Sequence, residues 1–241
     1  MRFRIALTLL PAIVCSGIVP CMAAKSEYPD PKRFEAQILA FEAKDKEQPP
    51  PRGAIVCIGS SSMKGWHEHI GEDLAPLTVI PRGFGGSDMN DAAYYADRIV
   101  IPYAPRAIVI YEGDNDIAAG IAPEKVRDAF REFVKSLRKR LPTARIYVMS
   151  IKPSPSRWAF WPKMQEANRL LAKECSRNKR LKYVDITAAM LDAGGQPLPD
   201  IFLADNLHMN RKGYELWRDV LRPVLMKSEL RYEKQKPAAA K

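Results

Sequence analysis

Short apolar runs alternate with amphipathic stretches through most of the chain. Five of the runs are almost continuously apolar and rich in β-branched residues, a pattern typical of parallel strands that are covered on both faces. These predicted strands cover residues 53–59, 77–80, 106–112, 145–151 and 181–186. Helical periodicity is found between and around them, at residues 31–44, 62–70, 88–100, 122–140, 162–178 and 210–224.

This alternation predicts a single α/β domain in which helices cover both faces of one five-stranded parallel sheet, a three-layer α/β/α architecture. Pro123 and Pro162 agree with it, because each stands in the first turn of a predicted helix, where proline is tolerated. No long Gly/Ser-rich linker divides the pattern, and the helix at 31–44 is expected to pack outside the repeat. The domain is expected to span residues 25–227.

The N-terminal segment differs from the rest of the chain. Arg2 and Arg4 precede an apolar stretch that ends in the small-residue sequence CMAA. A basic start, an apolar centre and small residues describe a secretory signal peptide, here residues 1–24 with cleavage after Ala23 or Ala24. The sequence therefore predicts an exported protein, periplasmic or secreted.

Two other interpretations of this segment remain open. A retained membrane anchor is disfavoured by Pro11, Pro20 and the short apolar length. Lipoprotein processing needs a cysteine such as Cys15 or Cys21, but Val14 and Pro20 are poor residues to precede a lipidated cysteine. Simple export is therefore preferred to either.

The chain is basic, with 38 Lys and Arg against 28 Asp and Glu among its 241 residues and a formal net charge of +10. Removal of the predicted signal peptide leaves about +8, an excess that favours weak association with anionic surfaces such as lipid headgroups. Acidic and basic residues are mixed along the predicted helices, for example at 122–140, which is typical of solvated helix faces. No nucleic-acid partner is expected, and the sequence does not indicate the oligomeric state.

Two cysteines follow the predicted cleavage site, so a disulfide framework is not indicated. Cys57 falls inside the first predicted strand and is expected to be buried there. Residues 228–241 lack apolar periodicity and are expected to form a flexible tail.

Polar and glycine-rich segments follow the predicted strands. In an open parallel sheet, binding and chemistry gather at the edge where the strands end and the helices begin. The segments expected at this edge are Ser60–Ser62, residues 81–88, 112–116, 152–162 and, before the last helix, 205–210. Their convergence favours a site there over a set of unrelated turns.

The three serines at 60–62 end the first strand, where they either cap a helix or supply a nucleophile. A nucleophilic serine needs a base, and Asp205 stands three residues before His208. In a tight turn the carboxylate can accept the imidazole Nδ1–H and leave Nε2 free to take a serine proton. This D-x-x-H pattern is common by chance, and its alternative is a helix N-terminal turn. The other histidines, His67 and His69, are expected to face solvent or neighbouring side chains.

A tetrahedral intermediate of acyl transfer also needs hydrogen-bond donors for its oxyanion. Gly86 allows close approach of the backbone to a substrate, and Asn115 offers a side-chain amide. Each has a simpler interpretation, a tight turn for Gly86 and an Asx-turn for Asn115.

Four short motifs, IGSSS, GFGGS, GDND and DNLH, stand in this order along the chain. Together they resemble the four signature blocks of the SGNH (GDSL-type) hydrolase family, and the resemblance extends over residues 53–224. It implies a flavodoxin-like α/β/α fold and assigns the nucleophile to Ser61, with Ser60 in place of the usual aspartate. The last block matches Asp205 and His208.

The resemblance also implies an oxyanion hole formed by the Ser61 N–H, the Gly86 N–H and the Asn115 side chain. The implied activity is hydrolysis of a carboxylic ester through a Ser-His-Asp triad and an acyl-enzyme, with no metal or organic cofactor. Small-molecule, lipid and acetylated-sugar esters are all candidate substrates. The alternatives are an acyltransferase and a non-catalytic carbohydrate- or lipid-binding protein on the same scaffold.

Other serine and phosphate chemistries fit the sequence less well. The G-x-S-x-G motif would need glycine at position 63, where the chain has Met63. Ser61 and Lys64 satisfy the S-x-x-K pattern of β-lactamases, but no K-T-G follows. The sequence contains no zinc-ligand spacing and no G-x-x-x-x-G-K-[ST] phosphate loop.

Aromatic residues near the predicted edge are candidates to line a substrate pocket. Trp66 follows the serines, and Trp158 and Trp161 lie on the loop after the fourth strand. Sugar stacking and acyl binding both use such side chains, and ordinary core packing is the alternative.

Overall fold

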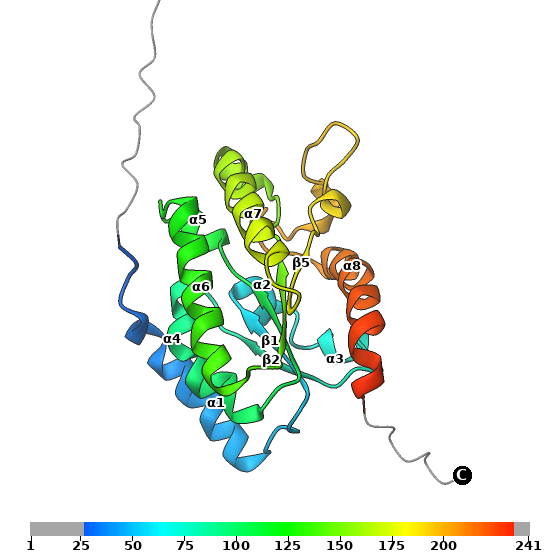
Figure 1. Ribbon diagram of the computed structural model, residues 1–241. Helices are drawn as coiled ribbons and strands as arrows, with labels where there is room; N and C mark the ends of the chain where they lie inside the picture. The colour runs from blue at the N-terminus through cyan, green and yellow to red at the C-terminus, as the bar shows by residue number, and fades with distance from the viewer. Residues whose placement is uncertain (1–26, 234–241) are drawn as a thin grey trace, which may run out of the picture.

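The computed structural model describes residues 27–233, which contain a five-stranded sheet of order β2-β1-β3-β4-β5 (Figure 1). All four neighbouring pairs of strands are parallel, so the predicted parallel α/β sheet is confirmed. The predicted signal peptide lies outside the described residues. The strands are β1 (Ile55–Gly59), β2 (Val79–Gly83), β3 (Ala107–Tyr111), β4 (Arg145–Met149) and β5 (Leu181–Val184).

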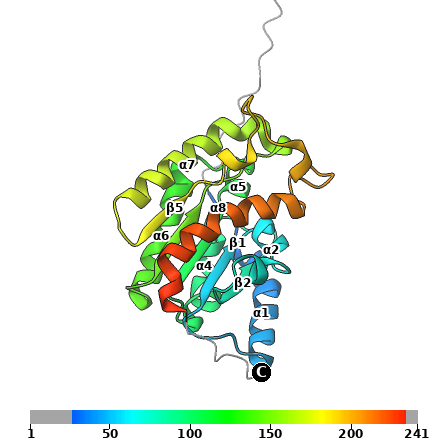
Figure 2. The ribbon, with the colours of Figure 1, turned by 90° about the vertical axis from the view of Figure 1, so that its right-hand side faces the viewer.

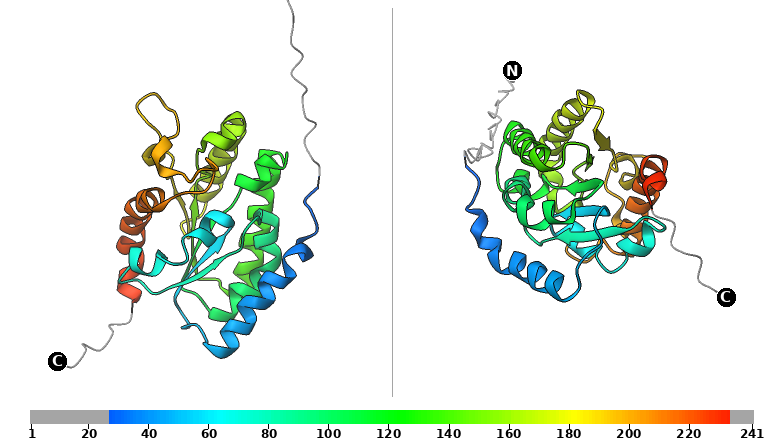
Figure 3. Two further views of the ribbon diagram at one scale, coloured as in Figure 1. Left: turned by 180° about the vertical axis from the view of Figure 1, so that it is seen from behind. Right: turned by 60° about the horizontal axis from the view of Figure 1, so that its bottom comes forward.

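Helices cover both faces of the sheet. Figure 2 shows α8 crossing in front of the strands, and Figure 3 shows α1 along the outside of the opposite layer, as predicted. No helix in the described part of the chain is long and apolar enough to cross a membrane. One layer holds α1 (Glu35–Glu47), α4 (Met89–Ile99), α6 (Pro123–Arg140) and α7 (Trp161–Ser176), and the other holds α2 (Ser61–Gly65), α3 (Ile70–Asp73) and α8 (Arg211–Glu229). Short 3₁₀ helices are η1 (Pro31–Phe34), η2 (Ile101–Tyr103), η3 (Pro155–Phe160), η4 (Ala188–Met190), η5 (Pro199–Ile201) and η6 (Leu230–Tyr232).

Strand β1, which is paired on both sides, shows why the strands are almost continuously apolar. Val56 and Ile58 contribute to the core beneath α4, α6 and α7, while Ile55 and Cys57 contribute to the core beneath α3 and α8. All four side chains are fully buried, because successive residues of a strand alternate between two covered faces. Cys57 is therefore a buried packing residue, as predicted.

Several elements differ from the sequence prediction. β2 lies later than the predicted 77–80 and contains Pro81, which an edge strand tolerates because part of its backbone needs no partner strand. The predicted helix at 62–70 is divided into α2 and α3 by a turn at residues 66–69. A short helix, α5 (Asp114–Ala118), follows β3 where no helix was predicted.

The C-terminal helix continues past the predicted domain end at residue 227. α8 extends to Glu229, whose fully buried carboxylate accepts hydrogen bonds from Arg145 (2.6 Å) and Tyr147 (2.6 Å). A buried carboxylate needs such partners, and here they come from β4 in the middle of the fold. Residues 228–233 therefore belong to the folded domain and not to a tail.

Close approach of α2 to the end of β2 depends on Gly83. The parallel register pairs this residue with Gly59, the last residue of β1. A Cβ added to Gly83 would lie 2.3 Å from the backbone N of Lys64 and 2.6 Å from the carbonyl carbon of Met63. Both atoms belong to the backbone of α2, so a side chain at position 83 would push this helix away from the sheet.

We predict that Gly83→Ala lowers the free energy of unfolding by about 1–3 kcal/mol, because the added methyl group overpacks a contact between two backbones. Urea denaturation of the variant and of the wild type measures the change. Gly71→Ala is the matched control: it lies in α3, and its added Cβ meets no atom within 4 Å. A Gly83→Ala variant as stable as the wild type would contradict the close approach.

Candidate active site

The turn after β1 brings Ser61 to the edge of the sheet. Gly59 ends the strand with a φ of +155°, and a Cβ there would lie 2.3 Å from the carbonyl oxygen of Tyr111. Only glycine fits this position. Ser60 is extended and is the N-cap residue, so α2 begins at once with Ser61.

The three serines differ in exposure and in contacts. Ser60 and Ser62 are each 2% exposed, whereas Ser61 is only partly buried. The Oγ of Ser61 lies 2.9 Å from Nε2 of His208, which comes from the loop before α8. Ser61, the serine that the family resemblance implies as the nucleophile, is thus the one of the three that contacts a histidine.

Asp205 contacts the other side of the imidazole. Its Oδ2 lies 2.6 Å from His208 Nδ1, and its Oδ1 accepts the backbone N–H groups of Leu207 (3.0 Å) and His208 (2.9 Å). These hydrogen bonds, the one to the imidazole first, lower the pKa of Asp205 to about 2. A carboxylate that faces Nδ1 keeps the proton on that nitrogen, so Nε2 faces Ser61 as an acceptor.

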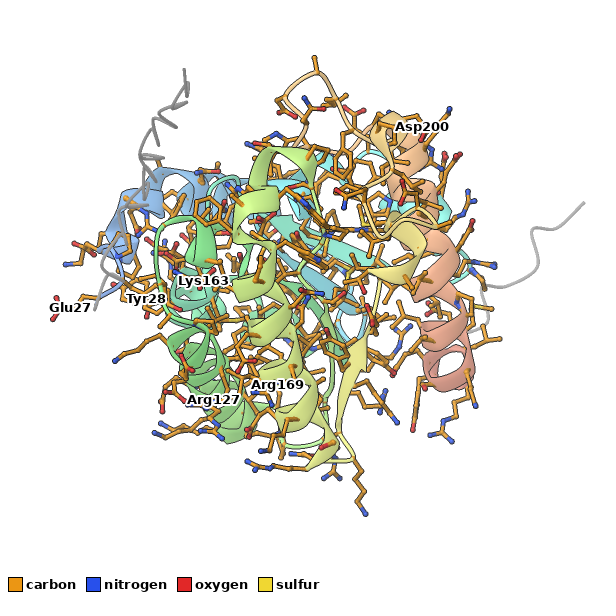
Figure 4. All side chains as sticks on the ribbon, turned by 90° about the horizontal axis from the view of Figure 1, so that it is seen from above. Glu27, Tyr28, Arg127, Lys163, Arg169 and Asp200 are labelled. Carbon is orange, nitrogen blue, oxygen red and sulfur yellow. The ribbon has the colours of Figure 1, made fainter. Side chains whose placement is uncertain are left out.

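Hydrogen bonds order the loop that carries this pair. The Leu203 N–H donates to the His208 carbonyl (2.7 Å), and the Asn210 side-chain amide donates to the carbonyl of Asp200 (2.8 Å), which is labelled in Figure 4. The side chains of Asp205 and His208 nevertheless remain 48% and 35% exposed. The pair is therefore held in place by its loop and open to water.

The loop between β2 and α4 lies directly against Ser61. A Cβ added to Gly85 would be 3.9 Å from the Ser61 Cβ. The next residue, Gly86, has a φ of +89°, a conformation that favours glycine. Asn115, in α5, is tied to this loop because its Nδ2 donates to the Ser87 carbonyl (2.8 Å). The structure thus brings Gly86 and Asn115 to the edge that carries Ser61.

Buried carboxyl groups, which were not singled out from the sequence, lie behind this loop. The Ser87 hydroxyl donates to Glu112 (2.6 Å), and burial raises the pKa of Glu112. Burial is also the main cause that raises the pKa of Asp116 to about 7 and that of Asp91 to about 8, with the charge of Asp88 adding to both. Their only signal in the sequence is a local excess of acidic residues, which does not distinguish buried carboxyls from exposed ones.

The first described residues cover this carboxyl cluster. The Tyr28 hydroxyl donates to Asp116 (2.9 Å), and Tyr28 is labelled at the margin of Figure 4. Arg33 pairs with both Asp88 (2.9 Å) and Asp91 (2.5 Å). The segment that leads into α1 therefore supplies a cation and a hydroxyl to carboxyl groups behind the Gly86 loop.

The tryptophans predicted to line a substrate pocket mostly serve the core. Trp66 is fully buried against Tyr214 and Trp217, so its predicted role in substrate binding is wrong. Trp161 is 8% exposed and packs into the core beneath α4 and α6, which corrects its assignment too. Trp158 stacks on Trp161 with 5.7 Å between ring centroids and stays partly exposed, so its role remains a prediction.

His67 stabilises the end of β2 and takes no part in the Ser61 contact. Its Nε2 accepts the backbone N–H of Gly83 (2.9 Å). Burial, followed by the charge of Arg82, lowers the pKa of His67 to about 4, so the ring is a neutral acceptor at neutral pH. The sequence predicted that His67 faces solvent or neighbouring side chains, and this hydrogen bond with a backbone N–H was not predicted.

A family model of GDSL-like lipases and acylhydrolases matches residues 52–216, more than half of the chain. The chain belongs to the GDSL-like lipase/acylhydrolase family. This membership confirms the resemblance to SGNH hydrolases and makes the protein an ester hydrolase. No curated protein matches the sequence.

Solved structures share the fold of this GDSL-like hydrolase at low sequence identity. A protein from Streptococcus pneumoniae has a TM-score of 0.70 at 20% identity, with 80% of this chain and 93% of that one covered. A GDSL-like lipase from Bacteroides thetaiotaomicron has a TM-score of 0.63 at 17% identity, with 83% and 98% covered. An acetyl-xylooligosaccharide esterase from Geobacillus has a TM-score of 0.54 at 15% identity, with 74% and 94% covered.

The raised pKa values of Asp116 and Asp91 predict a loss of stability as pH rises. Each carboxyl keeps its proton to higher pH in the folded protein than in the unfolded chain, so the stabilisation is present at low pH and lost through about pH 7 to 8. We expect the free energy of unfolding to fall between about pH 6.5 and about pH 8.5, above the titration of His67. Asp116→Asn should reduce this fall by up to about 1 kcal/mol.

Urea denaturation at several pH values in this window measures the effect. Asp219→Asn is the control, because Asp219 is an exposed carboxylate beside Arg218 on α8 and should leave the pH dependence unchanged. A wild-type protein with constant stability across the window, or an Asp116→Asn variant with the wild-type slope, would show that the buried carboxyls do not titrate as described.

Proposed function

We propose that this ester hydrolase is a serine esterase in which Ser61 is the nucleophile, His208 the general base and Asp205 the residue that orients His208. One observation carries the proposal: an unbroken line of contacts from Ser61 Oγ to His208 Nε2 (2.9 Å) and from His208 Nδ1 to Asp205 (2.6 Å). A serine hydroxyl is a poor nucleophile without such a base. The burial of the neighbouring Ser60 and Ser62 supports the choice of Ser61.

The proposed reaction begins when His208 takes the Ser61 proton as Oγ attacks the ester carbonyl carbon. The imidazolium that forms lies against Asp205, which stays ionised because its pKa is lowered to about 2. His208 then gives the proton to the leaving alcohol as the C–O bond breaks. A water molecule, deprotonated by His208, cleaves the acyl-enzyme by the same route and restores Ser61.

Three donors form the proposed oxyanion hole. Ser61 opens α2, and N–H groups in the first turn of a helix have no partner within the helix. The Gly86 N–H and the amide of Asn115 supply the others, since Ser87 takes only one of the two amide hydrogens. Such donors stabilise the negative charge that develops on the carbonyl oxygen in the transition state.

The proposed substrate is a small-molecule or acetylated-sugar ester. The similarity to an acetyl-xylooligosaccharide esterase supports acetylated sugars as candidates, and a lipid ester is the alternative. Hydrolysis is favoured over acyl transfer because the side chains of Asp205 and His208 are about half and one third exposed, so bulk water reaches the general base. The intact contacts of Ser61 disfavour a non-catalytic binding role.

We predict that Ser61→Ala abolishes ester hydrolysis, with a fall in kcat of roughly 10⁴-fold or more, because the nucleophile is lost. Labelling by a fluorophosphonate should be lost with it. Ser62→Ala is the matched control in the same helix and should keep most of the activity and the labelling. Assays with short- and long-chain esters and acetylated sugars also separate the substrate classes.

Retention of near-normal turnover and of fluorophosphonate labelling by Ser61→Ala would remove Ser61 from the reaction. A wild-type protein that takes up the label but transfers the acyl group to a sugar instead of water would favour the acyltransferase alternative. No labelling and no turnover by a folded wild-type protein would favour the binding role.

We also propose that the protein is exported after removal of residues 1–24. Arg2, Arg4 and the apolar stretch that follows support a signal peptide. Tyr28, four residues after the predicted cleavage site, already donates a hydrogen bond to Asp116. The excess of basic residues supports weak association with anionic surfaces outside the cytoplasm.

Intact-mass spectrometry of the native protein should find an N-terminus at Ala24 or Lys25, because the small residues of the CMAA sequence suit signal cleavage. The processed protein should be recovered outside the cytoplasm. An uncut N-terminus in a cytoplasmic fraction would refute export. A diacylglyceryl group on Cys15 or Cys21 would identify a lipoprotein instead.

A further inference from the structure

The loop after β4 brings Arg157 to the side chain of Asn115. Arg157 lies in η3 and reaches across to the start of α5. Its Nη2 donates to Asn115 Oδ1 (2.9 Å), and its Nη1 donates to Asp114 Oδ1 (2.5 Å). The Arg157 side chain is 17% exposed, so both hydrogen bonds are largely shielded from water.

Buried partners hold the guanidinium in this position. The Lys152 Nζ donates to Asp114 Oδ2 (2.6 Å), and the Tyr111 hydroxyl donates to the same oxygen (3.2 Å). Burial opposes ionisation of Asp114, but the charges of Lys152 and Arg157 outweigh burial and lower the pKa of Asp114. Two cations thus share one carboxylate, which leaves an excess positive charge beside Asn115.

These contacts determine which way the Asn115 amide faces. A guanidinium has only donors, so the oxygen of the amide must face Arg157. The amide nitrogen then faces Ser87, whose carbonyl accepts one of its two hydrogens (2.8 Å). The second hydrogen is left for an acceptor at the edge that carries Ser61. A flipped amide would turn its oxygen toward this edge and repel a developing oxyanion.

We propose that Arg157 is a positioning residue of the oxyanion hole and acts on the reaction through Asn115. The proposal rests on the proposed function of Asn115 as an oxyanion donor. Arg157 holds the amide in its donor orientation, and the charge-assisted hydrogen bond to the amide oxygen polarises the N–H bonds. The effect of Arg157 on the rate therefore requires Asn115 to be present.

A double-mutant cycle tests this requirement. Asn115→Ala should lower kcat roughly 10²–10³-fold, as expected for the loss of one oxyanion donor. Arg157→Met should lower kcat about 10-fold or more and change KM far less, because the ground-state carbonyl carries little charge. In the Asn115→Ala background, Arg157→Met should have almost no further effect on kcat. Losses that multiply in the double variant would overturn the proposal.

The side-chain amide of Asn115 gives a readout that does not depend on activity. Its two ¹H–¹⁵N signals are identified by their loss in Asn115→Ala, and in the wild type they should be well separated and exchange slowly with water. Arg157→Met should shift both toward the signals of a free amide and speed the exchange. Unchanged signals would overturn the proposal even if kcat fell. If the wild type hydrolyses no ester, the proposed function fails, and these signals still decide whether Arg157 orients Asn115.

Arg145→Met separates positioning from general destabilisation. Arg145 pairs with the fully buried Glu229, and its side chain is 21% exposed, close to the 17% of Arg157. It stands at the start of β4, at the end of the sheet opposite Ser61. This variant should lower the melting temperature about as much as Arg157→Met and leave kcat and the Asn115 signals unchanged. A fall in kcat equal to that of Arg157→Met would assign both effects to lost stability and overturn the proposal.

Discussion

The parallel pairing of β1 with both of its neighbours determines where the site lies. Gly59 stands opposite Gly83 of β2 and opposite Tyr111 of β3, so three strands end at one level. Glycine at 59 and 83 allows backbones to approach there more closely than any side chain would permit, and α2 can begin at once with Ser61. The loops after β2 and β3 start at the same level, which is why Gly86 and Asn115 lie at the same edge as Ser61.

Buried polar contacts then hold these loops. The Ser87 carbonyl accepts a hydrogen bond from the Asn115 side-chain amide, and the Ser87 hydroxyl donates one to Glu112. Arg157 donates a hydrogen bond to the oxygen of the same amide. Removing charged groups from water costs free energy that only close partners offset, and Asp114 has such partners. In the proposed mechanism the result is catalytic, because donors that are already oriented need no reorganisation when charge develops on the substrate.

The sheet could be predicted because strands covered on both faces appear as continuous apolar runs in the sequence. Only β2, an edge strand that contains Pro81, was displaced from its predicted position. The contact between Ser61 and His208 could be predicted because the order of the four motifs is a property of the linear sequence. The rest depends on contacts between distant segments. Arg157 reaches Asn115 from 42 positions along the chain without a local pattern, and Trp66 differs from a pocket residue only in that α8 covers it.

The proposed nucleophile and oxyanion hole are tested most directly by a crystal structure of the wild-type protein after reaction with a phosphonate ester, whose tetrahedral phosphorus mimics the intermediate. If Ser61 is the nucleophile, phosphorus should be bonded to Ser61 Oγ, with one phosphoryl oxygen about 2.7–3.1 Å from the Ser61 N, the Gly86 N and the Asn115 Nδ2. His208 Nε2 should lie within hydrogen-bond distance of the ester oxygen. Phosphorus on another side chain would contradict the role of Ser61, and a phosphoryl oxygen that turns away from all three donors would contradict the oxyanion hole.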